Sequence, residues 1–244
     1  MCIDLDGGIK GIRATTAFAD FCGFMVGLAL LWWLRPRNLP SLAMRTLFDT
    51  HALKRLVAIN QDIFVRTLCL LGSFGWFAHM GARQGDAVLA ANALLLNFQT
   101  FMAFGLDGFA HAAEALVSAA VGARDRATFR QAVKVTMLWS AIGAVGFSVV
   151  YWFAGGLIID ELTDQPVVRE TAMRFLPWAA VSPVVSVLGY QLDGVFIGAT
   201  RTYELMRAMA VSLVVFAFAA WVLVGPLGNH GLWLSLSVFM MARG

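Results

Sequence analysis

Charged residues are scarce in this sequence of 244 residues. Asp, Glu, Lys and Arg make up 14% of it, whereas hydrophobic residues make up 59%. A soluble domain carries about 25% charged residues, so the composition excludes an ordinary soluble protein. The net charge of +3 comes from basic residues that lie mostly between apolar segments. We interpret them as topological charges of a membrane protein, and we expect no nucleic-acid partner.

Cysteine and the common catalytic motifs are also nearly absent. The three cysteines, Cys2, Cys22 and Cys69, are odd in number and lack the spacing of a metal site, so we expect free thiols, no metal and no cofactor. The His-Glu-x-x-His pattern of zinc hydrolases is missing, as are the nucleophile elbow and the phosphate loop. The sequence therefore favours a protein that is not an enzyme.

The sequence does contain long apolar segments rich in Leu, Ala, Val, Phe and Gly. The period-two signal of a β-barrel is absent, so we expect an all-α membrane protein, a polytopic helical bundle. The predicted spans are residues 12–34, 56–80, 86–122, 129–159, 168–199 and 205–224, followed by the short segment 231–244. The fourteen residues of this last segment are too few to cross a bilayer.

Two of these spans contain residues that bend or interrupt helices. The span 86–122 would be ~54 Å long as a straight helix, against a hydrocarbon core of ~30 Å, so it must tilt, protrude or break. Gly105 and Gly108 make a bend plausible there. Pro177 and Pro183 predict a kink within 168–199, because each proline removes a backbone hydrogen bond.

The basic residues alternate along the chain in a way that predicts orientation. The loops after the first, third and fifth spans carry five, four and two of them, and the other loops carry fewer. Loops rich in Lys and Arg remain cytoplasmic. We therefore predict that residues 36–55 are cytoplasmic and residues 160–166 external.

An ionisable stripe lies in the middle of the chain. Asp107, His111 and Glu114 are four and then three residues apart, so they share one face of a helix. Ionisable groups at membrane depth cost roughly 2.5–3.5 kcal/mol each and are kept where they face a bundle interior or a wet cavity. We expect a substrate or cation site. Two alternatives are hydrogen bonding between helices and a zinc site of a membrane-embedded metallohydrolase, because these side chains are acceptable zinc ligands.

Three further charged residues are candidates. Asp193 is a second carboxylate in a Leu-Asp-Gly context, about 12 Å along the helix from Arg201. It is either a cation or proton site or a carboxylate that caps a neighbouring helix. Asp62 and Arg66 are four residues apart, and we expect them to neutralise each other on one helix.

A weak internal repeat suggests a two-lobe plan. The segments 8–12 and 228–232 share a Gly-x-x-Gly-aliphatic pattern and lie 220 residues apart. Two parallel repeats of six spans are a known transporter arrangement. The chain would then hold the last span of the first repeat and nearly all of the second.

Several motifs carry a resemblance to a known family. LDGFAHAAEALVSAAVGARDR at 106–126, QLDGVFIGATR at 191–201, NQDIFVRTLC at 60–69 and GNHGLWL at 228–234 resemble the second lobe of multidrug and toxic compound extrusion (MATE) transporters, in their DinF-like branch. Members have twelve helices in two six-helix lobes. The resemblance assigns 1–35 to the last transmembrane helix of the first lobe, 36–55 to a cytoplasmic linker between the lobes, and 56–244 to the second-lobe bundle, truncated in its last helix.

The same resemblance implies a function. MATE transporters of the inner (plasma) membrane export cationic or amphipathic compounds in exchange for protons or sodium, and the first lobe is missing from this chain. A glutamate of the sodium-type branch would fall near Leu68, where the chain has no carboxylate, so proton coupling is favoured. A flippase for a lipid-linked substrate is the alternative within the superfamily. The candidate substrate and cation site consists of Asp107, His111, Glu114, Asp193, Asp62 and Arg66.

Overall fold

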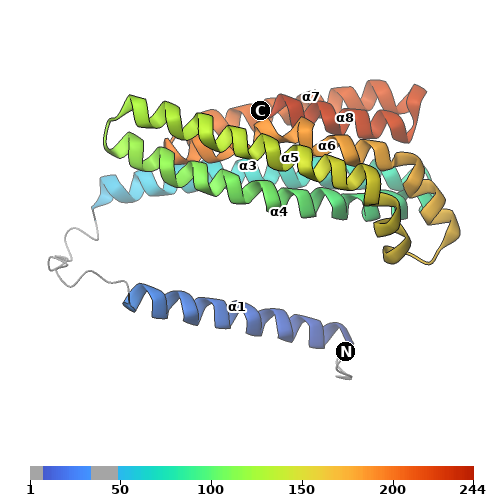
Figure 1. Cartoon of the computed structure of the whole chain (residues 1–244), viewed down its shortest axis with the longest axis horizontal. Helices are drawn as coiled ribbons and strands as arrows, with labels where there is room; N and C mark the ends of the chain where they lie inside the picture. The colour runs from blue at the N-terminus through green and yellow to red at the C-terminus, as the bar shows by residue number, and fades with distance from the viewer. Residues whose placement is uncertain (1–7, 34–48) are drawn as a thin grey trace. The chain divides into compact units, whose positions relative to one another are not determined.

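The described residues, 8–33 and 49–244 of a computed structural model, form helices and contain no strand (Figure 1). The chain divides into two compact units, Met1–Leu53 and Lys54–Gly244. The predicted all-α fold is therefore confirmed. The described helices are α1 (Gly8–Trp33), α3 (Thr50–Ala82), α4 (Asp86–Gly122), α5 (Arg126–Leu162), α6 (Pro166–Gly198), α7 (Thr202–Leu227) and α8 (Asn229–Ala242).

Five of these helices, α3 to α7, are long and apolar enough to cross a membrane. They confirm the second to sixth predicted spans, and α8 has only 14 residues, as expected. In α1 the described apolar stretch, Ala17–Leu30, is shorter than a full span, so a crossing there stays a prediction. Most of the predicted linker lies outside the described residues, and α3 already begins at Thr50.

The helices α4 and α6 are continuous where the sequence suggested interruptions. Helix α4 runs through Gly105 and Gly108, so the considered break does not occur. Helix α6 begins with Pro166 in its first turn, where the missing N–H costs nothing, and continues through Pro177 and Pro183. Because the unbroken helix α4 is about 55 Å long, it must tilt or protrude to fit a bilayer.

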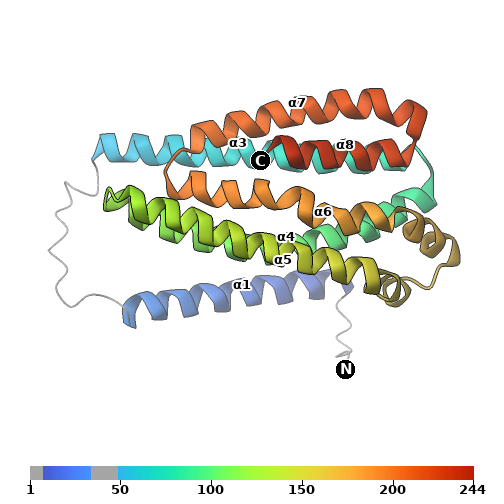
Figure 2. The same cartoon turned by 45° about the horizontal axis from the view of Figure 1, so that its top comes forward.

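Helices α4, α5 and α6 pack together, and α7 and α8 form an antiparallel pair beside α6 (Figure 2). Helices α4 and α6 cross closely at two glycines. A Cβ atom at Gly194 would lie 2.1 Å from the Ala110 carbonyl oxygen, and one at Gly198 would lie 2.6 Å from that of Glu114. Only glycine permits this approach, which places the α4 ionisable stripe directly against α6.

Apolar side chains make up most of the bundle interior and also cover its outer surface. Phe77 of α3 packs edge-on against Trp233 of α8, with ring centroids 5.1 Å apart. Large side chains also point outward: Phe153 is 80% and Trp221 78% exposed. Exposed aromatics of this size on long helices are what a lipid environment accepts and water does not.

A buried amide cluster, made of Asn92, Asn229 and Trp233, joins α4 to α8. The two asparagines exchange hydrogen bonds of 2.8 and 2.9 Å, and the Trp233 indole donates to Asn92 Oδ1 at 3.0 Å. Asn92 is 1% and Asn229 5% exposed. Because buried polar groups require partners, this reciprocal pairing lets both amides lie in the apolar core.

Candidate functional site

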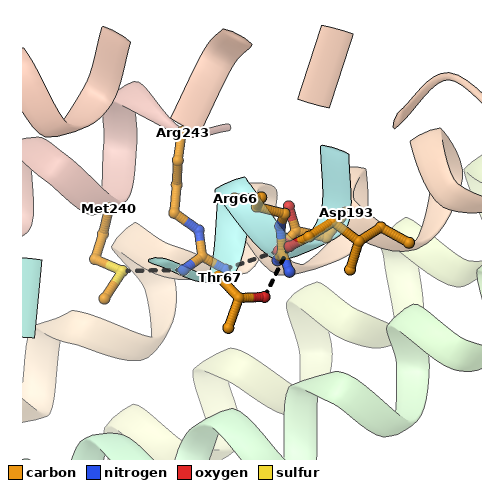
Figure 3. A network of polar contacts seen from close by, with 6 residues as sticks. Arg66, Thr67, Asp193, Met240 and Arg243 are labelled. Atoms are coloured by element: carbon orange, nitrogen blue, oxygen red, sulfur yellow. Dashed lines mark hydrogen bonds and ion pairs between the residues drawn. The ribbon is translucent and has the colours of Figure 1, made fainter. Parts of the chain in front are cut away.

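A charged cluster of Arg66, Asp193 and Arg243 lies inside the bundle (Figure 3). Both guanidinium groups bond the same carboxylate oxygen, Oδ2 of Asp193: Arg66 from α3, and Arg243, directly after α8, at 3.1 Å. The side chains of Asp193 and Arg243 are 8% and 1% exposed. Two cations on one anion leave the cluster with a net positive charge.

Neighbouring side chains hold Arg243 in place. Its guanidinium carbon lies 4.4 Å from the centre of the Tyr190 ring, a cation–π contact. Its Nη1 atom approaches the Met240 sulfur at 3.8 Å. Three buried polar atoms of the cluster nevertheless lack a hydrogen-bond partner within the described part of the chain: Nε of Arg66, Nε of Arg243 and Oδ1 of Asp193.

The three residues of the cluster line a cavity of about 240 Å³ between α3, α4, α6 and the end of α8. The charged cluster lines one side of this cavity, and the ionisable stripe of α4 lines the other. A cavity with a few convergent polar groups is the usual form of a ligand site, and ionisable residues inside a membrane bundle mark such sites. Its charged and titratable lining residues are Arg66, Asp107, His111, Glu114, Tyr190, Asp193 and Arg243.

The α4 stripe gathers as its spacing predicted. Asp107 is half-buried at the cavity, and Glu114 keeps a side-chain exposure of 38%. The Nδ1 atom of His111 lies 3.5 Å from Oε2 of Glu114, one helical turn away, and His111 is largely exposed. Unlike Asp193, these carboxylates have no arginine bonded to them among the described residues. Asp107 and Glu114 are therefore the carboxylates of this cavity whose negative charge is available to a cationic ligand.

The predicted pair between Asp62 and Arg66 is wrong. Arg66 bonds Asp193 on α6 instead, and Asp62 accepts a hydrogen bond of 2.9 Å from the Thr202 hydroxyl at the start of α7. Asp62 does not line the cavity. Arg66 pairs with Asp193, the more buried of the two carboxylates, because Coulomb attraction strengthens as water is excluded.

The zinc-site alternative finds no support in the geometry. Within the described residues, no three His, Cys, Asp or Glu side chains are arranged to hold a metal ion. His111 and Glu114 approach each other, while Asp107 lies about one turn before His111, nearer the start of α4.

The sequence interpretation missed Arg243. The signal was available, because Arg243 is the one charged residue in the apolar stretch from Leu232 to Gly244. A lone arginine beside such a stretch is costly at membrane depth, which favours a buried counter-ion. Its partner, Asp193, lies 50 residues earlier, so no local spacing could reveal the contact.

This architecture defines a polytopic helical membrane bundle with a charged internal cavity, and the comparisons with known proteins give its family. The chain belongs to the MatE family, whose sequence model matches residues 63–222. It is 39% identical over its whole length to DNA damage-inducible protein F of Escherichia coli (strain K12). It is also 23% identical, over 73% of its length, to DETOXIFICATION 45, a chloroplastic protein of Arabidopsis thaliana. The predicted family is thus confirmed.

A solved structure shows the same fold. A MOP superfamily transporter from Pyrococcus furiosus Vc1 (DSM3638) superposes with a TM-score of 0.70 over 78% of this chain, at 16% identity. The chain covers 42% of that structure, 53% of the Escherichia coli protein and 32% of the Arabidopsis protein. It therefore spans about half the length, or less, of the relatives that it matches.

Proposed function

We propose that this chain is the second-lobe half of a secondary antiporter that exports cationic or amphipathic compounds from the cell in exchange for protons. Membership of the MatE family and the charged cavity within a multi-pass bundle support this function. In this proposal, residues 1–35 provide the last helix of a first lobe, 36–55 a cytoplasmic linker, and 56–244 the second lobe, in the inner membrane. The relatives' greater length supports a partner lobe of similar size.

The carboxylates Asp107 and Glu114 are the proposed cation-attracting groups. The observation that carries this assignment is the charged cluster: Asp193 is already held by Arg66 and Arg243, so its charge is more than neutralised. A cationic substrate entering the cavity gains attraction only from the α4 side. This differs from the sequence interpretation, in which Asp193 shared that role equally.

Proton exchange follows from ordinary carboxylate chemistry. A carboxylate that binds a proton loses the charge that attracts a cation, so proton and substrate compete for one site. Hard metal cations are bound by several oxygen ligands, and the arginines at Asp193 remove one carboxylate from any such cage for sodium. Together with the uncharged residue at Leu68, this favours protons over sodium as the coupling ion.

The test uses the chain joined to the first lobe of its Escherichia coli relative, in inverted membrane vesicles. Asp107→Asn should abolish transport of a cationic dye driven by a proton gradient, because the amide keeps the shape and loses the charge. Asp62→Asn is the matched control, since Asp62 lies on a membrane helix outside the cavity. Equal transport by Asp107→Asn and the parent from pH 6 to pH 8 would contradict the assignment.

Two further arms examine the coupling ion and the missing lobe. Replacing the proton gradient by a sodium gradient should give no dye transport. The 244-residue chain alone should also give none, because half of the cavity wall is absent. Efflux from the isolated chain would overturn the two-lobe proposal.

A further inference from the structure

A group of basic residues lies at the start of α5. Arg124 is in the turn before the helix, and Arg126, Arg130 and Lys134 follow at intervals of four residues along its first turns. All four are exposed. A rise of 1.5 Å per residue places Lys134 about 12 Å along the axis from Arg126.

These four side chains have no counter-ion in the described part of the chain. The neighbouring acid, Asp125, already accepts hydrogen bonds from the Ala127 and Thr128 amides and, at 2.6 Å, from the Thr128 hydroxyl. The next turn at the same end of the bundle differs, because Arg201 there pairs with Glu204 at 3.0 Å. Four unpaired basic groups therefore remain available to a ligand.

An apolar column continues the same face of α5. Leu138, Val145 and Trp152 follow Lys134 after four, eleven and eighteen residues, so they return to nearly the same side of the helix. They are 60%, 52% and 58% exposed. The opposite side packs into the bundle through Thr136 and Ser140, both buried.

The length of α5 places this pattern at a membrane boundary. Its 37 residues extend about 55 Å, roughly 25 Å more than the hydrocarbon core, so both helix ends reach the headgroup regions. The basic residues occupy one such end and the apolar column lies in the core. The surface thus presents positive charge beside the phosphates and apolar side chains beside the acyl chains.

We propose that this face, formed by Arg126, Arg130 and Lys134 with Leu138 and Trp152, is a binding site for one anionic phospholipid. The arginines hold the phosphate through paired N–H donors, and Lys134 adds a point charge below them. The acyl chains lie along the apolar column. This site is separate from the charged cavity, so the proposal is independent of the transported substrate.

The test is native mass spectrometry of the 244-residue chain in detergent with equimolar phosphatidylglycerol and phosphatidylcholine of identical acyl chains. The unmodified chain should retain phosphatidylglycerol preferentially. The double variant Arg130→Gln/Lys134→Gln should lower that retention on the order of tenfold, as expected when two basic contacts to an anionic lipid are lost. Lys54→Gln/Arg55→Gln, which removes the same charge from the start of α3, is the matched control and should retain the lipid.

Each alternative outcome overturns the proposal. Equal retention of the two lipids by the unmodified chain would exclude a headgroup site, and equal losses in both double variants would indicate charge without a defined site. Displacement of the lipid by millimolar inorganic phosphate would assign the basic residues to a free anion. Trp152→Ala should weaken retention at unchanged charge, and because all altered side chains are exposed, an unchanged melting temperature verifies folding.

Discussion

The two buried polar clusters that join α8 to its neighbours differ in how completely their polar groups are paired. In the amide cluster, every side-chain group of Asn92, Asn229 and Trp233 has a partner, and no charge is involved. In the charged cluster, two guanidinium groups share one oxygen, and three buried polar atoms have no partner among residues 8–33 and 49–244. The amide cluster satisfies all its hydrogen-bonding groups, whereas the charged cluster leaves unpartnered polar atoms and one excess positive charge.

This difference separates a structural role from a functional one. A fully paired neutral network fixes the packing of α4 against α8 and has nothing left to offer a ligand. A network with unpaired groups beside a cavity costs stability, and a fold retains it where a ligand or a proton completes it. The contrast is the reason for placing the candidate site at the charged cluster and the α4 stripe.

The largest expected effect comes from removing the central anion. Asp193→Ala leaves Arg66 and Arg243 buried without a counter-ion, which should lower the free energy of unfolding by about 3–5 kcal/mol. Chemical denaturation in detergent micelles measures it. Replacing all three residues by Leu or Met should restore stability, because the desolvation cost disappears with the charges. If Asp193→Ala unfolds like the parent, the cluster is not an ion-pair network.

The next effect concerns the crossing that brings the α4 stripe to the cluster. Gly194→Ala would place a Cβ atom 2.1 Å from the Ala110 carbonyl oxygen, so α4 and α6 must separate. We expect a loss of about 1–3 kcal/mol, measured by thermal unfolding. Gly108→Ala is the matched control on α4, because a Cβ atom there meets nothing within 4 Å. Equal effects of the two substitutions would argue against the close crossing.

Removing one amide from the neutral cluster should cost less than removing Asp193. Asn92→Leu leaves the Asn229 amide and the Trp233 indole without their partner, a loss of about 1–3 kcal/mol. Dye transport by the two-lobe protein should keep its pH profile. A pH profile shifted by Asn92→Leu would erase the distinction between the clusters.

The smallest effect belongs to an exposed charge, the helix cap Asp125. Hydrogen bonds from the Thr128 hydroxyl and from the Thr128 and Ala127 amides hold the pKa of this carboxyl below its ordinary 3.8. Its stabilisation is therefore present at neutral pH, decreases as the pH falls below 3.8, and is lost below the lowered pKa. Asp125→Asn keeps a cap without a titrating group. Its melting temperature should match the parent at pH 7 and exceed it slightly below pH 4.

The spans and the α4 stripe were predictable because both depend on local periodicity. An apolar run of twenty or more residues specifies a membrane helix whatever surrounds it. The four-and-three spacing of Asp107, His111 and Glu114 places them on one face of any α-helix. These predictions agree with α3 to α7 and with the cavity lining.

The partners of the charged residues depended on which helices meet, and local spacing was misleading there. Asp62 and Arg66 are well placed to pair, yet Arg66 reaches Asp193, 127 residues away, and Arg243 reaches it from the end of α8. The close α4–α6 crossing at Gly194 and Gly198 and the position of α8 beside α6 create that buried environment. Burial strengthens an ion pair and penalises an unpaired charge, so the most enclosed carboxylate collects the arginines. Sequence spacing encodes neighbours along one helix, whereas enclosure arises only after several helices have packed.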